Sequence, residues 1–185
     1  MGQSRHLTLN LNARIMPFDR GDLFEDPIND MLQEAGIGEV DGGGTLQEKT
    51  GEIINCDVEI CLTGNLDENY EKLKGFLGRL WIPKGSFLVS EDKNEEIGFL
   101  EGLALYLNGT DLEDEVYKSC DVNFVISELL RALGEDCKFY SYWQGPEETA
   151  LYFYGQSFGR MNSLMTPFIE EYPLCNKSRV VQIAR

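Results

Sequence analysis

The chain has 185 residues, a length that allows one large domain or two small ones and a sizeable hydrophobic core. Hydrophobic residues make up 42% of it and aromatic residues 11%, which is typical of a globular protein and not of a disordered one. The 32 acidic and 16 basic residues give a net charge of −16, which excludes nucleic acids and anionic lipid surfaces as partners, because both require a basic footprint. The acidity either steers a basic partner or serves only solubility.

Cysteine usage and the N-terminal segment indicate the compartment. The five cysteines follow no disulfide framework and no CxxC spacing, and the single histidine, His6, leaves little nitrogen for a zinc site. We expect buried reduced thiols, no metal and no cofactor. The segment MGQSRHLTLNLNAR has no apolar stretch or cleavage site of a signal peptide, so we expect a cytoplasmic protein. The sequence leaves open whether the protein is a monomer or a dimer.

The first half of the chain predicts alternating strands and helices. Residues 6–15, HLTLNLNARI, alternate apolar and polar side chains, which is typical of a half-buried strand. After a loop, Asp26-Pro27 is expected to open a helix that Gly36 ends. The further predicted elements are strands over 39–47 and 52–62, a helix over 65–81 and a short strand over 86–90.

The second half repeats this order after a charged segment, 91–98, that we interpret as a linker. The acidic segment 109–120 is predicted to be a loop, and Pro167 is expected to kink or divide the last helix. The predicted elements are a strand over 99–109, a helix over 121–134, strands over 137–143 and 149–155, a helix over 157–172 and a strand over 179–185.

Each half therefore has the order β-α-β-β-α-β, the split-βαβ pattern of ferredoxin-like domains. The sequence predicts an α+β protein of two tandem ferredoxin-like units with antiparallel sheets, over residues 1–92 and 93–185. Both helices of such a unit cover one sheet face, so the other face needs solvent, a partner or the sister unit. The placement of the two units stays open.

The stretch Asp41-Gly42-Gly43-Gly44-Thr45 raises the question of a phosphate-binding loop. Such a loop leads into a helix N-terminus and carries a lysine after its glycines. Here a second strand follows, no lysine comes directly after, and acidic residues flank the glycines. We interpret them as a bulge, a bend or a close backbone approach, with a docked partner segment as the alternative.

No residue set predicts catalysis. His6 lies near the chain end without a triad partner, and carboxylate pairs have no specificity among 32 acids. The acidic cluster Asp111, Glu113, Asp114 and Glu115 lacks the spacing of a calcium loop. We expect a non-enzyme, and we interpret this cluster as a solvated or partner-facing loop.

The predicted hairpin over 137–155 is unusually rich in aromatic residues. Simple alternation places Tyr140, Tyr142, Tyr152 and Tyr154 on one face, and Phe139, Trp143 and Phe153 on the other. The hairpin is then either buried on both faces or has one face that binds a partner, where tyrosine and tryptophan are favoured.

The overall acidity and the segment GTDLEDEVYKSCD, in a small α+β protein without catalytic motifs, resemble the immunity proteins of bacterial polymorphic toxin systems. The resemblance implies a non-catalytic protein that binds a basic toxin domain and occludes it. The chain also resembles tandem ferredoxin-like modules of bacterial regulators, which implies a small molecule in an aromatic-lined cleft between the repeats. The predicted partner-binding residues are Asp111, Glu113, Asp114, Glu115, Tyr140, Tyr142, Trp143, Tyr152 and Tyr154.

Overall fold

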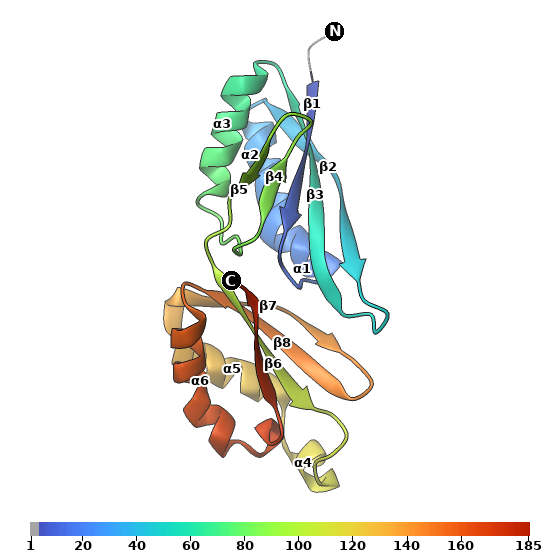
Figure 1. Ribbon diagram of the computed structural model, residues 1–185, viewed down its shortest axis with the longest axis vertical. Coiled ribbons are helices and arrows are strands. Elements are labelled where there is room, and N and C mark those ends of the chain that lie inside the picture. The colour runs from blue at the N-terminus through green and yellow to red at the C-terminus, as the bar shows by residue number, and fades with distance from the viewer. Residues whose placement is uncertain (1–3) are drawn as a thin grey trace. The chain divides into compact units, whose positions relative to one another are not determined.

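The computed structural model describes residues 4–185, so the first three residues of the N-terminal segment discussed above lie outside the described residues. The described chain divides into two compact units (Figure 1). The first unit runs to Glu48 and resumes over Ile53–Phe99, and the second comprises Lys49–Glu52 and Leu100–Arg185. The division after Phe99 falls later than the expected boundary after residue 92.

The first unit contains an antiparallel sheet of order β2-β3-β1-β4-β5. Its first four strands follow the ferredoxin-like order, and β5 extends the sheet beyond β4. The elements are β1 (Ser4–Leu11), α1 (Pro17–Arg20), the π-helical turn η1 (Gly21–Glu25), α2 (Asp26–Glu34), β2 (Gly38–Gln47), β3 (Ile53–Thr63), α3 (Leu66–Leu77), β4 (Phe87–Val89) and β5 (Asn94–Glu96).

The second unit repeats this topology with the antiparallel order β7-β8-β6-β9. The prediction of two tandem ferredoxin-like units with antiparallel sheets is therefore confirmed. The elements are β6 (Glu101–Asn108), α4 (Asp114–Ser119), α5 (Val122–Leu133), η2 (Gly134–Asp136), β7 (Cys137–Gln144), β8 (Glu148–Gly155), α6 (Phe158–Glu171), η3 (Pro173–Cys175) and β9 (Arg179–Ala184).

The sheet of the first unit has one apolar face and one polar face. Alternate side chains of β1, including Leu7 and Leu9, are buried, and α2 and α3 lie over one side of the sheet (Figure 1). The intervening residues form a polar row, in which Thr8 Oγ1 donates to Glu59 at 3.0 Å. In the same row Asn10 Nδ2 donates to Asp57 at 2.7 Å. Strict alternation in β1 therefore produces the two-faced sheet that the sequence predicts.

The core of the second unit lies between its sheet and helices α5 and α6. Leucines of β6 pack there with Leu129 of α5 and Met165 of α6, all of which are buried. Asp121 caps α5 as expected, with its side chain accepting the N–H of Asn123 at 2.8 Å. Gly134 ends the helix with a φ of 67°, a value that favours glycine.

The first helix begins earlier than the sequence predicts. Residues before Asp26 were expected to form a loop, but helical structure starts at Pro17 and continues through η1 into α2. Pro17 occupies the first helical position, where its missing N–H costs nothing. The missing N–H of Pro27 falls where the π-helical turn gives way to α2, so the helix is not broken there.

Three other expectations are corrected. The segment 91–98, interpreted as a linker, contains β5, which pairs with β4. The acidic segment 109–120, predicted to be a loop, contains α4. Pro167 does not divide the last helix, because α6 runs through it as one element. Each error follows from composition, because charged residues and proline indicate exposure or disruption more strongly than they exclude short elements held by tertiary contacts.

The glycine run makes room for a buried arginine. Arg20 is buried, and its Nε donates to Glu25 Oε1 at 2.6 Å. Its Nη1 donates to the carbonyl of Gly44 at 2.7 Å and to Thr45 Oγ1 at 2.8 Å. A Cβ on Gly43 would lie 2.6 Å from the carbonyl oxygen of Asp57 and 2.8 Å from Glu25 Oε1. The glycines, which follow a β-bulge after Val40, thus permit a close backbone approach in β2.

We expect Gly43→Ala to lower the free energy of unfolding by about 1–3 kcal/mol, because the added methyl group meets the backbone of the neighbouring strand. Gly44→Ala is the matched control, since its Cβ would find no atom closer than 3.7 Å. Urea denaturation of both variants measures the difference. Equal stabilities of the two variants would contradict this account of the glycines.

Candidate functional site

A β-bulge in β7 determines where the predicted aromatic residues point. Phe139 pairs with Phe153, but the next pair is Ser141 with Tyr152, so Tyr140 is an extra residue. Tyr142 then lies opposite Leu151, a residue of the helix-facing core. The expected alternation is therefore wrong beyond Tyr140, because one inserted residue exchanges the faces of all that follow.

After the bulge, Trp143 lies opposite Ala150 and shares the tyrosine-bearing sheet face. Tyr140, Tyr152 and Tyr154 are buried on this face, and the rings of Tyr140 and Tyr154 lie 4.5 Å apart. Burial raises the pKa of Tyr140, so it stays protonated in the folded protein. Of the five predicted aromatic contact residues, all within the described range, only Tyr142 is exposed, and Trp143 is half-buried.

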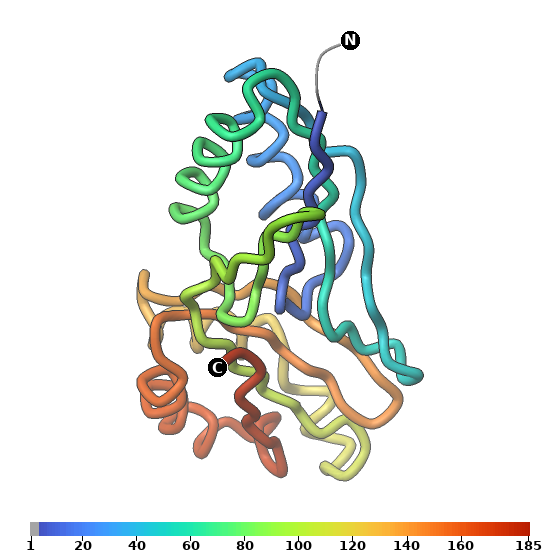
Figure 2. Tube along the Cα trace, turned by 45° about the horizontal axis from the view of Figure 1, so that its top comes forward, coloured from blue at the N-terminus to red at the C-terminus, as the bar shows by residue number. Residues whose placement is uncertain are grey.

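Glu52 supplies the acceptor for two hydroxyl groups on that face. Tyr106 Oη donates to Glu52 Oε1 at 2.5 Å, and Tyr152 Oη donates to the same oxygen at 2.8 Å. Glu52 is only 9% exposed and belongs to the short segment Lys49–Glu52 that groups with the second unit. Figure 2 shows the β2–β3 hairpin whose connection carries this segment. The sequence analysis missed Glu52, since nothing in its local pattern separates it from the other acids.

An open groove of about 500 Å³ lies within the second unit, at the end of the sheet where β6 and β7 finish. Tyr142 stands at it with 47% of its surface exposed. None of the described residues that line the groove carries a formal charge. They are Leu107, Asn108, Gly109, Tyr117, Val122, Asn123, Ile126, Tyr142, Gln144, Thr149, Leu151 and Leu174.

The segment that carries the predicted acidic cluster borders this groove. Asn108 Oδ1 accepts the N–H groups of Thr110 at 3.0 Å and Asp111 at 2.7 Å. Tyr117 Oη accepts the N–H of Leu112 at 3.0 Å. Because Asn108 and Tyr117 also line the groove, the segment that carries the cluster is tied to the groove wall.

The four acids of this cluster occupy two kinds of structure. Asp111 precedes α4 and Glu113 is its N-cap residue, whereas Asp114 and Glu115 form its first turn. Carboxylates in a first turn interact favourably with the partial positive charge of a helix N-terminus, which accounts for a helix in a segment this acidic. The structure thus places Tyr142 and the segment that carries the acids at one groove, whose lining includes neither the four acids nor the three buried tyrosines.

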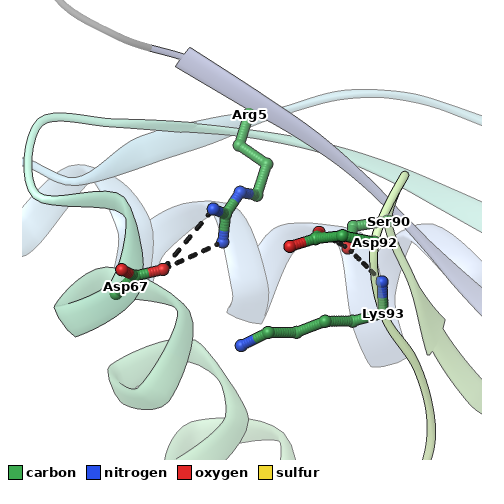
Figure 3. Close-up of polar contacts among 5 residues, drawn as sticks. All are labelled: Arg5, Asp67, Ser90, Asp92 and Lys93. Atoms are coloured by element: carbon green, nitrogen blue, oxygen red, sulfur yellow. Dashed lines mark hydrogen bonds and ion pairs between the residues drawn. The ribbon is translucent and has the colours of Figure 1, made fainter.

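The first unit contains a cavity of mixed charge, of about 410 Å³, lined by Ser4, Arg5, His6, Glu91 and Asp92. Figure 3 shows Arg5 directed at Asp67, with 3.4 Å between Nη1 and Oδ1. Ser90 Oγ donates to Asp92 at 2.9 Å, and this hydrogen bond lowers the pKa of Asp92. Lys93 Nζ lies 4.1 Å from the ring centroid of Tyr70. The lining combines the cationic Arg5 with the acidic Glu91 and Asp92, so it does not favour a ligand of one sign.

Residues 4–185 hold no cluster of His, Cys, Asp and Glu side chains arranged to bind a metal. His6 Nδ1 lies 3.9 Å from Asp41 at the surface. The five cysteines, all in the described range, are free thiols. Burial raises the pKa of Cys56 and of Cys137 to about 12 and that of Cys175 to about 11, so these thiols are protonated and weakly nucleophilic at neutral pH. None of the helices described is long and apolar enough to cross a bilayer.

No protein-family model and no curated protein matches the chain. Among solved structures, a mutant chlorite dismutase from Candidatus Nitrospira defluvii is similar at 10% identity, covering 98% of this chain and 92% of that one, with a TM-score of 0.30. An unknown protein from Galdieria sulphuraria is similar at 10% identity, covering 97% and 98%, with a TM-score of 0.29. The ligand-free regulatory subunit of aspartate kinase from Thermus thermophilus is similar at 11% identity, covering 93% and 97%, with a TM-score of 0.26.

We expect Glu52→Ala to lower the free energy of unfolding by about 2–3 kcal/mol, because two buried tyrosine hydroxyls lose a carboxylate acceptor. Adding Tyr152→Phe to this variant should recover part of the loss, since it removes one of those hydroxyls. Glu48→Ala, at an exposed glutamate of the same connection, should change stability by less than about 0.5 kcal/mol. If Glu52→Ala and Glu48→Ala prove equally stable in thermal and urea unfolding, the hydrogen bonds of Glu52 contribute nothing.

The thiols should react in the order of their accessibility. In the native protein at pH 8, a maleimide reagent should modify the half-buried Cys61 and Cys120 before Cys56, Cys137 and Cys175. Denaturation should make all five react together, because the unfolded thiols return to an ordinary pKa. Peptide mass spectrometry over a time course measures the order, and early modification of Cys56 would contradict it.

Proposed function

We propose that the protein is a non-catalytic binding protein whose second unit captures a basic protein partner. This is the role that the resemblance to immunity proteins implies, with a basic toxin domain as the partner. One observation supports the proposal: the segment that carries the acidic cluster Asp111, Glu113, Asp114 and Glu115 also supplies Tyr117 to the wall of a groove at which the exposed Tyr142 stands.

Charge and shape have separate roles in this proposal. Exposed charges act over about 8 Å at physiological salt, so the acidic cluster accelerates the encounter with a basic surface. Buried aromatic contacts slow dissociation, and tyrosine is enriched among the residues that dominate such interfaces. Tyr142 and the half-buried Trp143 remain candidates for this role, whereas Tyr140, Tyr152 and Tyr154 support the fold.

The groove also favours a second candidate function, which is binding of a small molecule. Its volume of about 500 Å³ falls in the usual range for ligand pockets, and its lining is mainly apolar with a few amide and hydroxyl groups. This groove lies within the second unit, whereas the sequence-based hypothesis placed a cleft between the repeats. A neutral ligand would bind there with little dependence on salt or on the acidic cluster.

Neutralising the cluster should slow capture of the partner. Tagged full-length protein is used to isolate its partner from the native host, and association rates are then measured with the purified pair. We expect the combined change Asp111→Asn, Glu113→Gln, Asp114→Asn and Glu115→Gln to reduce the association rate by roughly tenfold or more at low salt. Folding stability should change by less than about 1 kcal/mol, because solvated charges contribute little.

The matched control removes the same charge from exposed acids of the first unit, with Asp22→Asn, Asp30→Asn, Glu34→Gln and Glu71→Gln. It should reduce the association rate by a smaller factor than the cluster variant does, because it removes the same charge without changing the proposed contact. Equal association rates for the two charge variants would contradict the proposal and leave the acidity as a feature of solubility.

A further inference from the structure

We infer that the groove of the second unit receives a bulky apolar side chain that the partner carries beside lysine or arginine. The inference rests on the proposed function and adds the chemistry of the recognised segment. Its basis is the position of an uncharged, largely apolar groove directly beside a concentrated acidic segment.

The groove floor requires an apolar occupant. Leu107, Leu151 and Ile126 supply aliphatic surface from two strands and a helix. Tyr142 adds an aromatic side chain from β7, one of the two edge strands of its sheet. Apolar surface of this kind gains most from water-excluding contact with another apolar group, whereas a charged side chain would lose its hydration without an ionic partner in the lining.

The acidic segment beside the groove determines which residues can flank the apolar side chain in the partner. Residues 111–121 hold five acids and one lysine. Lys177 Nζ donates to the backbone carbonyl of Asp111 at 2.7 Å, and the four acidic residues of the cluster are exposed. A purely apolar ligand would not use these charges, and an acidic peptide would be repelled by them. A basic segment with one bulky apolar residue matches both the groove and its border.

The polar residues around the groove fit a peptide in the same way. Asn123, Gln144 and Thr149 offer amide and hydroxyl groups that can donate to or accept from a peptide backbone. The backbone N–H of Asn123 is already capped by Asp121, so its side chain is not needed to hold the helix start. Asn123 is therefore a position where the groove can be filled without loss of a helix cap.

The probe is a short synthetic peptide with one central tryptophan flanked on both sides by lysine and arginine. Two matched peptides replace the tryptophan by serine, or the basic residues by glutamate. Full-length protein is titrated with each peptide by calorimetry at low salt. We expect the tryptophan peptide to bind at least roughly tenfold more tightly than the serine peptide, as burial of one large side chain allows. The glutamate peptide should not bind.

Groove filling then tests where the tryptophan binds. Asn123→Trp should abolish the preference for tryptophan over serine, while Ala132→Trp, on an exposed part of α5 away from the groove, should preserve it. Tyr142→Ser should weaken the preference without filling the groove, which guards against a folding defect in the first variant. Thermal unfolding of each variant confirms that it is folded.

The failures of the two proposals are distinguishable. Equal affinity for the tryptophan and serine peptides, with both lost in the acid-neutralised variant, would overturn the groove inference and leave acid-directed capture standing. A tryptophan preference that persists in Asn123→Trp would also overturn it. Failure of both basic peptides to bind, together with unchanged partner capture by the acid-neutralised variant, would overturn both.

Discussion

The placement of the candidate site depends on one extra residue in β7. The bulge at Tyr140 changes which side chains share a sheet face, and it brings Tyr142 opposite Leu151, toward the helices. Without the insertion, Tyr142 would lie with the buried tyrosines and the groove would keep only Tyr117 of its two tyrosines. Trp143 would then lie on the helix-facing side of the sheet instead of the tyrosine-bearing face. A single unpaired residue thus separates an aromatic residue at the surface from those that support the fold.

The architecture could be predicted because the chain obeys local rules over most of its length. The alternation of apolar and polar side chains correctly predicted β1. Asp121 and Gly134 correctly predicted where α5 begins and ends. The order of the four strands in each sheet follows from the β-α-β-β-α-β connectivity, because both helices of a unit must cover the same sheet face. The acidic cluster is visible in the sequence as charge density, and the segment that carries it supplies Tyr117 to the groove wall.

What could not be predicted depends on contacts between distant residues. No local pattern distinguishes a bulge at Tyr140 from regular alternation, and none singles out Glu52 from other acids. Arg20 is a comparable case, because a buried guanidinium was hidden in a segment interpreted as a loop. The glycines indicated a close backbone approach, but only the fold shows that an arginine and a glutamate occupy the space. The groove exists only once β6, β7 and α5 meet.

The segment Lys49–Glu52 has a consequence for how the protein forms during synthesis. Its carboxylate accepts a hydrogen bond from Tyr152, 100 positions further along the chain. During synthesis, the residues of the first ferredoxin-like unit are therefore made before Tyr106 and Tyr152, the two donors to Glu52. The second unit is complete only when it includes the segment Lys49–Glu52, which is made much earlier than the rest of that unit. Such long-range closure slows folding relative to local contacts. Unit-by-unit folding thus leaves the hydrogen bonds on the tyrosine face of the second sheet to form late.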